Sequence, residues 1–148
     1  MTTKLNVIYN NIIIKNNNIT IWSIAHIYQA ILNNEQGIEN IKFATTLAGY
    51  IHYRLTGEKV IGIGEGSGIF PVDTNSISYD EKMVDKFNCL INDLVPWKIL
   101  DILPKNLLAG DDAGKLTTQG ALLLDPNGTL EAGIPYVHQK VIWEQEWL

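Results

Sequence analysis

Cysteine and basic residues are both scarce in this chain. Cys89 is the only cysteine among 148 residues, so the chain cannot form an internal disulfide. It begins with no secretory signal pattern, and apolar runs such as residues 12–14 are far too short to cross a bilayer. Lys and Arg number 11 against 16 Asp and Glu, the net charge is −5, and no basic cluster stands out. These features predict a cytoplasmic protein that binds neither nucleic acid nor membranes.

The chain has enough apolar residues for a globular domain, with 46% hydrophobic and 18% charged residues. Apolar residues at helical spacing predict helices from about Ser23, from about Ile41 and after Ser78, where Ser78 and Glu81 fit a capping box. We expect the first two helices to pack as an adjacent pair. The predicted buried stripe of the second consists of Ala44, Leu47, Ala48, Ile51 and Leu55, and Gly57 is placed to end this helix.

A glycine-rich segment follows, with the sequence EKVIGIGEGSGIFPVD. Its beginning predicts a short strand, its alternating glycines predict a close-packed loop, and residues 69–72 predict a return strand. Further along, residues 107–124 predict the end of a strand, a turn with Gly110 and Gly114, and a short helix capped by Thr117. Residues 1–21 are expected to form either a hairpin or a poorly packed irregular end.

Several residues are candidates for chemistry. Glu65 lies at the centre of the glycine segment, where it is either a general base or an ordinary exposed acid. Trp22 either stacks on a sugar ring or opens the first helix as a hydrophobic staple. The three histidines and the Asp111-Asp112 pair have no metal-ligand spacing, so we expect no metal site. Cys89 is expected to pack as a small apolar residue.

Neither glycine-containing segment completes a nucleotide-binding motif. In GIGEGSG, Ser67 stands where a dinucleotide fingerprint needs its third glycine. In GDDAGKLT, the loop is one residue short of a phosphate loop, and Leu116 follows the lysine where Ser or Thr would bind magnesium. A plain turn is the preferred interpretation of the second segment.

Taken in order, four strings resemble one family. They are WSIAHIYQAILNNE, TTLAGYIHYRLTGEKVIGIGEGSGIFPVD, YDEKMVDKF and PWKILDILPKNLLAGDDAGKLTTQGALLLDPNGTLEAGIP. Together they cover residues 22–135 and resemble the latter part of the N-terminal domain of the FGGY carbohydrate kinases. The most specific portion is YRLTGE with the glycine segment and FPVD that follow it. The resemblance implies an α/β fold, as a helix-rich, partial ribonuclease-H-like domain of the actin, hexokinase and sugar kinase type.

The resemblance also implies an activity, the transfer of phosphate from ATP to a hydroxyl of a sugar or polyol with Mg²⁺. By this analogy Glu65 is the catalytic base, and Ser67 and Trp22 contact the substrate. The sequence departs from the family pattern, because it has GEGSG where relatives typically show GDASG, and some family branches place the catalytic acid at the position of Gly62. The register of the catalytic acid therefore stays open.

The family's N-terminal hairpin and C-terminal ATPase lobe have no counterpart in the sequence. We therefore expect that this chain binds neither ATP nor Mg²⁺ and is inactive alone, and that its protein partner is a complementing kinase fragment or a second copy. Two alternatives are a non-enzymatic sugar- or partner-binding module and a non-functional gene remnant.

The expected organisation is an irregular segment at 1–21, a partial kinase domain at 22–136 and a tail at 137–148. The resemblance stops at Pro135. With suitably chosen codons, a shifted frame turns HQKVIWEQEW into PPEGDLGTGM, which has the Gly-Asp and Gly-Thr-Gly character of the family's next segment. The tail is therefore expected to be read out of frame. The alternative is a divergent C-terminus with Trp143 and Trp147 on one helical face.

Overall fold

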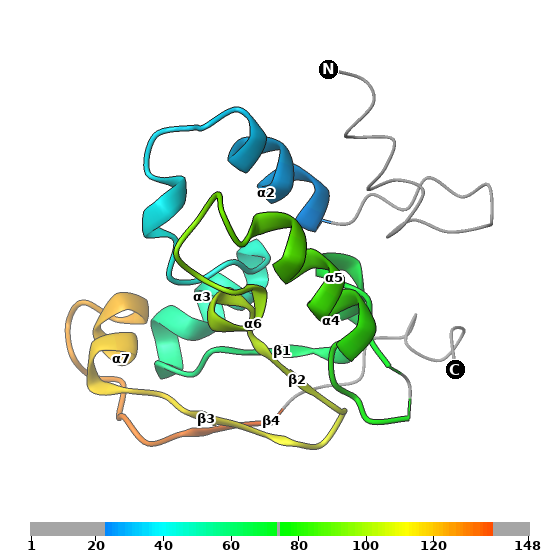
Figure 1. The fold of residues 1–148 in the computed structure, drawn as a ribbon. Coiled ribbons are helices and arrows are strands. Elements are labelled where there is room, and N and C mark those ends of the chain that lie inside the picture. Colours follow the sequence, from blue (N-terminus) through cyan, green and yellow to red (C-terminus); the bar gives the residue numbers. More distant parts are fainter. Residues whose placement is uncertain (1–22, 74, 138–148) are drawn as a thin grey trace.

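The computed structural model describes residues 23–73 and 75–137, drawn in colour in Figure 1. Trp22 and nearly all of the predicted tail therefore lie outside the described residues. The helices are α2 (Ser23–Leu32), the 3-10 helix η1 (Ile38–Asn40), α3 (Leu47–Thr56), α4 (Ile63–Ile69), α5 (Glu81–Ile91), α6 (Ile99–Ile102) and α7 (Thr118–Leu124). The strands are β1 (Val60–Gly62), β2 (Lys105–Leu107), β3 (Asp112–Lys115) and β4 (Pro135–Val137).

The strands form two small sheets. Strands β1 and β2 are parallel, with Ile61 opposite Asn106, and β3 and β4 are antiparallel. The α/β class predicted from the sequence is therefore confirmed. Because parallel strands need a long crossover, the chain passes through α4, α5 and α6 between β1 and β2.

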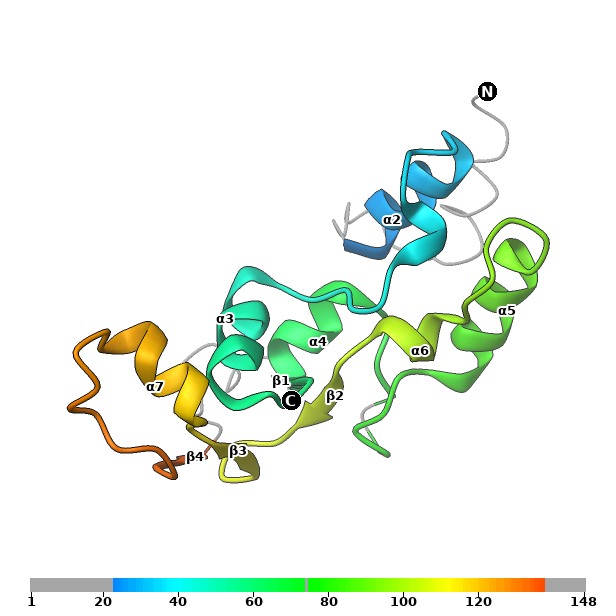
Figure 2. The ribbon, with the colours of Figure 1, turned by 90° about the vertical axis from the view of Figure 1, so that its left-hand side faces the viewer.

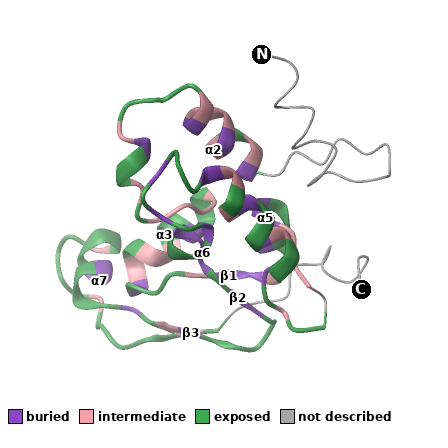
Figure 3. Ribbon diagram, viewed as in Figure 1, coloured by how far each residue is buried: buried purple, intermediate pink, exposed green. Residues whose placement is uncertain are grey.

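The main core lies among α2, α4, α5 and α6 (Figure 3). Phe87 is its centre, because its ring packs edge-to-face against Tyr28 and Phe70 at centroid distances of 5.9 Å each. Phe70 in turn contacts Tyr79 at 6.0 Å. The buried indole of Trp97 donates a hydrogen bond to the carbonyl of Ile38, which fixes η1 to the core. Edge-to-face contacts of this kind add to the stabilisation from burial.

Helices α3 and α7 pack together at the other end of the molecule, beside β3 (Figure 2). Thr117 caps α7 by accepting a hydrogen bond from the backbone N–H of Gly120, and its hydroxyl donates to the carbonyl of Leu55 in α3. Gly120 lies directly against that same carbonyl, where a side chain would not fit. The cap predicted at Thr117 is confirmed.

The second predicted helix begins later than its apolar pattern indicates. Residues 41–46 precede the helix, Thr46 caps α3 at its N-terminus, and Gly57 ends it with φ of 80° as predicted. Three residues of the predicted stripe face outward, since Leu47 is 75% exposed, Ile51 is 51% exposed and Ala48 is exposed, whereas Ala44 packs against the core and Leu55 is half-buried. The inward positions are instead Gly49, His52, Tyr53 and Thr56, which also recur at helical spacing. The helical spacing was therefore predicted correctly, but the buried face of the helix was not.

The glycine segment is a helix and not the predicted loop. After β1, Gly62 caps α4, which contains the remaining glycines of the segment. The predicted return strand is also wrong, because Ile69 ends α4 and only Val72 pairs, in an isolated bridge with Tyr79. The buried Gly66 lets the α4 backbone approach the side chain of Asn106 closely, so that the helix packs on β2.

Three further expectations need correction. Helix α2 packs against α4, whereas α3 packs against α7, so the predicted α2–α3 pair does not form. Helix α5 is capped by Asp80, whose carboxylate accepts from the N–H of Met83, and not by Ser78. Cys89 is exposed, because it falls on the outer side of α5, opposite Phe87 and Ile91.

Candidate functional site

Glu65 lies in the first turn of α4, just beyond the carboxyl end of the parallel strand β1. Its side chain is exposed, and its carboxylate accepts a hydrogen bond from the hydroxyl of Thr46 at 3.4 Å. The same Thr46 hydroxyl accepts from the backbone N–H of Gly49 at 3.0 Å. Thr46 therefore links the start of α3 to the predicted catalytic acid, a neighbour that the sequence did not indicate.

Of the two other predicted site residues, only Ser67 belongs to the described part of the chain. Ser67 is exposed on α4, and its hydroxyl donates to the carbonyl of Gly64 in its own helix at 2.7 Å. Because it is two residues from Glu65 in a helix, the two side chains point in different directions. Trp22 lies outside the described residues. Gly62, the alternative position for the acid, is buried at the end of β1 and brings no side chain.

Two hollows flank the extended segment 41–46. The first, of about 440 Å³, lies between this segment and α3, and we call it the lysine hollow; it is lined by Lys42, Phe43, Thr45, Thr46, Leu47, Tyr50, Tyr53 and Lys59. The second, of about 330 Å³, is lined by Ser23, Ile27, Ile41, Phe43, Ala44, Thr45 and Ile69. Neither lining includes Glu65 or Ser67, but Thr46 joins the lysine hollow to Glu65.

Cations and aromatic rings are interleaved in the lysine hollow. The Lys59 ammonium lies 5.1 Å from the centroid of the Phe43 ring and donates to the carbonyl of Lys42 at 3.0 Å. Phe43 also contacts Tyr53 edge-to-face at 5.2 Å. Arg54, which is not one of the lining residues, has its guanidinium 5.9 Å from the centroid of the Tyr50 ring and donates to the Tyr50 hydroxyl. The sequence alone does not indicate this cluster, because its residues come from three separate segments.

Buried polar atoms beside the site have unmet hydrogen-bonding capacity. The Thr45 hydroxyl and both side-chain polar atoms of Asn106 are buried without a partner in the described structure. Such groups are uncommon in folded proteins and usually mark a ligand, a water or a functional role. Thr45 lines both hollows. Asn106 lies under α4, on the inner side of the helix that bears Glu65.

His26, His52 and the Asp111-Asp112 pair belong to residues 23–73 and 75–137, the part of the chain that the structure describes. No group of three or more His, Cys, Asp and Glu side chains in that part of the chain is arranged to hold a metal ion. His26 is exposed, and His52 bonds through Nε2 to the carbonyl of Ala113 at 2.8 Å. The two aspartates of the predicted turn bond backbone N–H groups, Asp111 that of Leu108 and Asp112 that of Gly114.

Comparison with protein-family models, with curated proteins and with solved structures finds no match to this chain. Among the described helices, none has the length and apolar character needed to cross a membrane.

Proposed function

We propose that this chain is part of an FGGY-family carbohydrate kinase, in which Glu65 accepts the proton of a sugar or polyol hydroxyl as phosphate is transferred from ATP. The observation that carries the proposal is the position of Glu65. Ligands of open α/β sheets bind beyond the carboxyl ends of parallel strands, and Glu65 is an exposed carboxylate at that end of β1. A general base must be reachable by the substrate hydroxyl, which an exposed carboxylate beside a hollow allows.

The finer fold assignment, a partial ribonuclease-H-like domain, is part of the same proposal. It is supported by the order of elements around the site, in which α3 ends at Gly57, β1 follows, and the acid comes directly after the strand. Strands β1 and β2 are only three residues each, and α4 packs against both of them, which stabilises so small a sheet. In the proposed parent kinase, further strands and the ATP- and Mg²⁺-binding elements would come from the rest of the protein.

Sugar binding by the isolated chain tests the proposal. We expect ketoses or polyols to shift the backbone amide NMR resonances of residues 46 and 63–69, with a dissociation constant of about 1 mM or weaker, near −4 kcal/mol. Glu65→Gln should weaken this binding. Glu81→Gln is the matched control, because Glu81 is also an exposed acid in the first turn of a helix. No shift with any ketose or polyol, or equal weakening by both variants, would count against the proposal.

A non-enzymatic binding module is the second candidate, and the lysine hollow is the observation that favours it. Aromatic walls with polar groups are typical of small-molecule sites, and this hollow does not include Glu65. If the chain is such a module, Glu65→Gln leaves ligand binding unchanged. Substitutions in the lysine hollow would then be the ones that abolish it.

A further inference from the structure

We propose that the lysine hollow binds the phosphate monoester of a small sugar, with Lys42 and Lys59 holding the phosphate. This inference goes beyond the proposed kinase function, because the hollow does not include Glu65 and binding there requires no phosphate transfer. It deepens the second candidate, the binding module, by naming the class of ligand. It rests on the shape of the hollow, on the sign of its charges and on the chemistry of its walls.

The hollow is the space between two parts of the chain that run back alongside each other. Segment 41–46 leads into α3 at Thr46, and α3 then returns so that Tyr53 contacts Phe43. At the end of the hollow farthest from Thr46, the hydrogen bond from Lys59 to the Lys42 carbonyl joins the two parts of the chain. Both lysines therefore lie at the end away from Thr46 and from the Glu65 carboxylate bonded to it. The volume of about 440 Å³ lies within the range of small-molecule sites.

The charges of the hollow favour an anion. Its eight lining residues include two lysines and no carboxylate, although the whole chain has a net charge of −5. An ammonium has three N–H donors, and the described contacts of Lys59 use one of them, toward the Lys42 carbonyl. Two donors remain for a phosphate oxygen. Both lysines are exposed, so an incoming anion can reach them without prior opening of the structure.

The walls favour a sugar over a nucleotide base. The face of Phe43 is already occupied by Lys59, and the Tyr53 ring meets Phe43 at an interplanar angle of 60°. The two rings therefore do not form a parallel slot for a flat base. Thr46, Tyr50 and Tyr53 line the same space, and each carries a hydroxyl group of the kind that exchanges hydrogen bonds with the hydroxyls of a sugar.

Titration of the full chain with four probes tests this assignment. The probes are glucose 6-phosphate, glucose, inorganic phosphate and AMP, followed by the amide resonances of residues 42–59 at low ionic strength. We expect glucose 6-phosphate to bind at least fivefold more tightly than each of the other three. Lys59→Gln and Lys42→Gln should each weaken its binding roughly fivefold, the upper range for an exposed ion pair. Added salt should weaken it as well.

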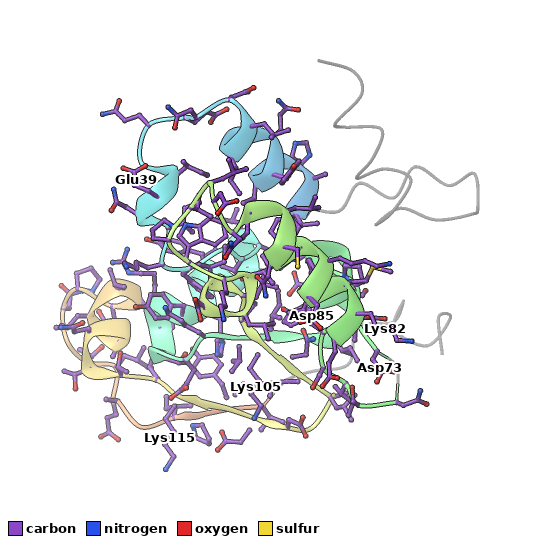
Figure 4. The ribbon with its side chains drawn as sticks, in the orientation of Figure 1. Glu39, Asp73, Lys82, Asp85, Lys105 and Lys115 are labelled. Carbon is purple, nitrogen blue, oxygen red and sulfur yellow. The ribbon has the colours of Figure 1, made fainter. Side chains whose placement is uncertain are left out.

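Lys82→Gln is the control variant, since Lys82 is an exposed lysine on α5 outside the hollow (Figure 4). It should bind glucose 6-phosphate as the parent chain does. The proposal is overturned if glucose 6-phosphate does not bind, or if Lys82→Gln weakens binding as much as the two hollow variants. It is also overturned if inorganic phosphate, glucose or AMP binds as tightly. None of these outcomes depends on Glu65, so the failure of one proposal is distinguishable from failure of the other.

Discussion

Gly66, the residue after Glu65 in α4, lies directly against Asn106 of β2. A Cβ atom at Gly66 would overlap the side-chain oxygen of Asn106, which is 8% exposed in β2. At Gly68, two residues later in α4, an added Cβ meets nothing within 4 Å. The two glycines therefore have different roles in one short helix.

We expect Gly66→Ala to destabilise the fold by about 1–3 kcal/mol, because it overpacks a buried contact. Gly68→Ala should be neutral or stabilising by up to about 1 kcal/mol, since alanine is the better helix former. Urea unfolding followed by circular dichroism measures both. Asn106→Ala in the Gly66→Ala background should restore much of the loss, because it makes room and removes polar atoms that lack partners. Equal effects of the two glycine substitutions would contradict the packing of α4 on β2.

Tyr79 makes the stability of the core sensitive to alkaline pH. Burial raises the pKa of its hydroxyl above the ordinary value of 10.0, and the hydroxyl donates to the carbonyl of Pro104 at 2.9 Å. The stabilisation is fully present below the pKa of the unfolded chain. As pH rises above about 10, the unfolded state loses this proton first, so the free energy of unfolding falls.

Tyr79→Phe should therefore show a shallower loss of stability than the parent chain between about pH 10 and pH 11. At pH 7 the variant should be less stable by about 1 kcal/mol, because the buried Pro104 carbonyl loses its donor. Urea midpoints measured at pH 7, 10 and 11 provide the comparison. Burial also raises the pKa of Tyr28, so some alkaline dependence should remain in the variant. If the urea midpoints of the variant and the parent chain fall equally with pH, Tyr79 is not the cause of the alkaline loss of stability.

Helices α3 and α7 are held together by close backbone approach more than by apolar side chains. Gly120 of α7 lies on the carbonyl of Leu55, and a methyl group there would overlap backbone atoms that cannot move cheaply. We expect Gly120→Ala to lower the free energy of unfolding by about 2 kcal/mol. Gln119→Ala, at the exposed neighbouring position, should change it by less than about 0.5 kcal/mol. Thermal unfolding of both variants measures these changes. If Gly120→Ala is as stable as the parent chain, the contact between Gly120 and Leu55 is refuted.

The sequence predicts an element best where a single local rule decides it. Thr117, Gly57 and the apolar face of α5 each follow such a rule, and each is confirmed. For α3 the sequence predicted the wrong face, because this helix does not pack against its neighbours through an apolar stripe. Gly49 and Thr56 face inward there, and no hydropathy pattern indicates burial of such residues.

The candidate site was predictable only in part for a related reason. The sequence indicated Glu65 as the acid of the glycine segment. Its contact with Thr46 joins residues 19 positions apart, and the lysine hollow joins segments that become neighbours only when α3 folds back. Glycines normally indicate a loop, and the helix at α4 depends on its close packing against β2, which is more than 35 residues later.

At the scale of the whole molecule, exposed apolar residues gather on α3 and α7. Leu122, Leu123 and Leu124 are 49%, 53% and 56% exposed, and Leu47 and Ile51 are exposed on α3. Three consecutive exposed leucines favour association. We expect the chain to self-associate as its concentration rises, measured by light scattering after size-exclusion chromatography.

Leu123→Glu should reduce that self-association without a large change in the unfolding temperature. Gln119→Glu adds the same charge to the same helix and removes no apolar surface, so it is the matched control. A monodisperse monomer at every concentration would contradict this expectation. So would an equal effect of the two variants, because the charge alone would then explain the change.

A chimaera with an intact FGGY kinase tests the proposal that these residues supply the sugar-side acid of a carbohydrate kinase. Residues 23–135 would replace the corresponding segment of an intact FGGY kinase, and sugar-dependent ATP consumption would be measured in a coupled assay. We predict that the isolated chain shows no turnover and that the chimaera phosphorylates a sugar or polyol. Glu65→Gln should lower kcat of the chimaera at least 100-fold, as loss of a general base does. A folded chimaera with no turnover, or one whose kcat is unchanged by Glu65→Gln, would contradict the proposal.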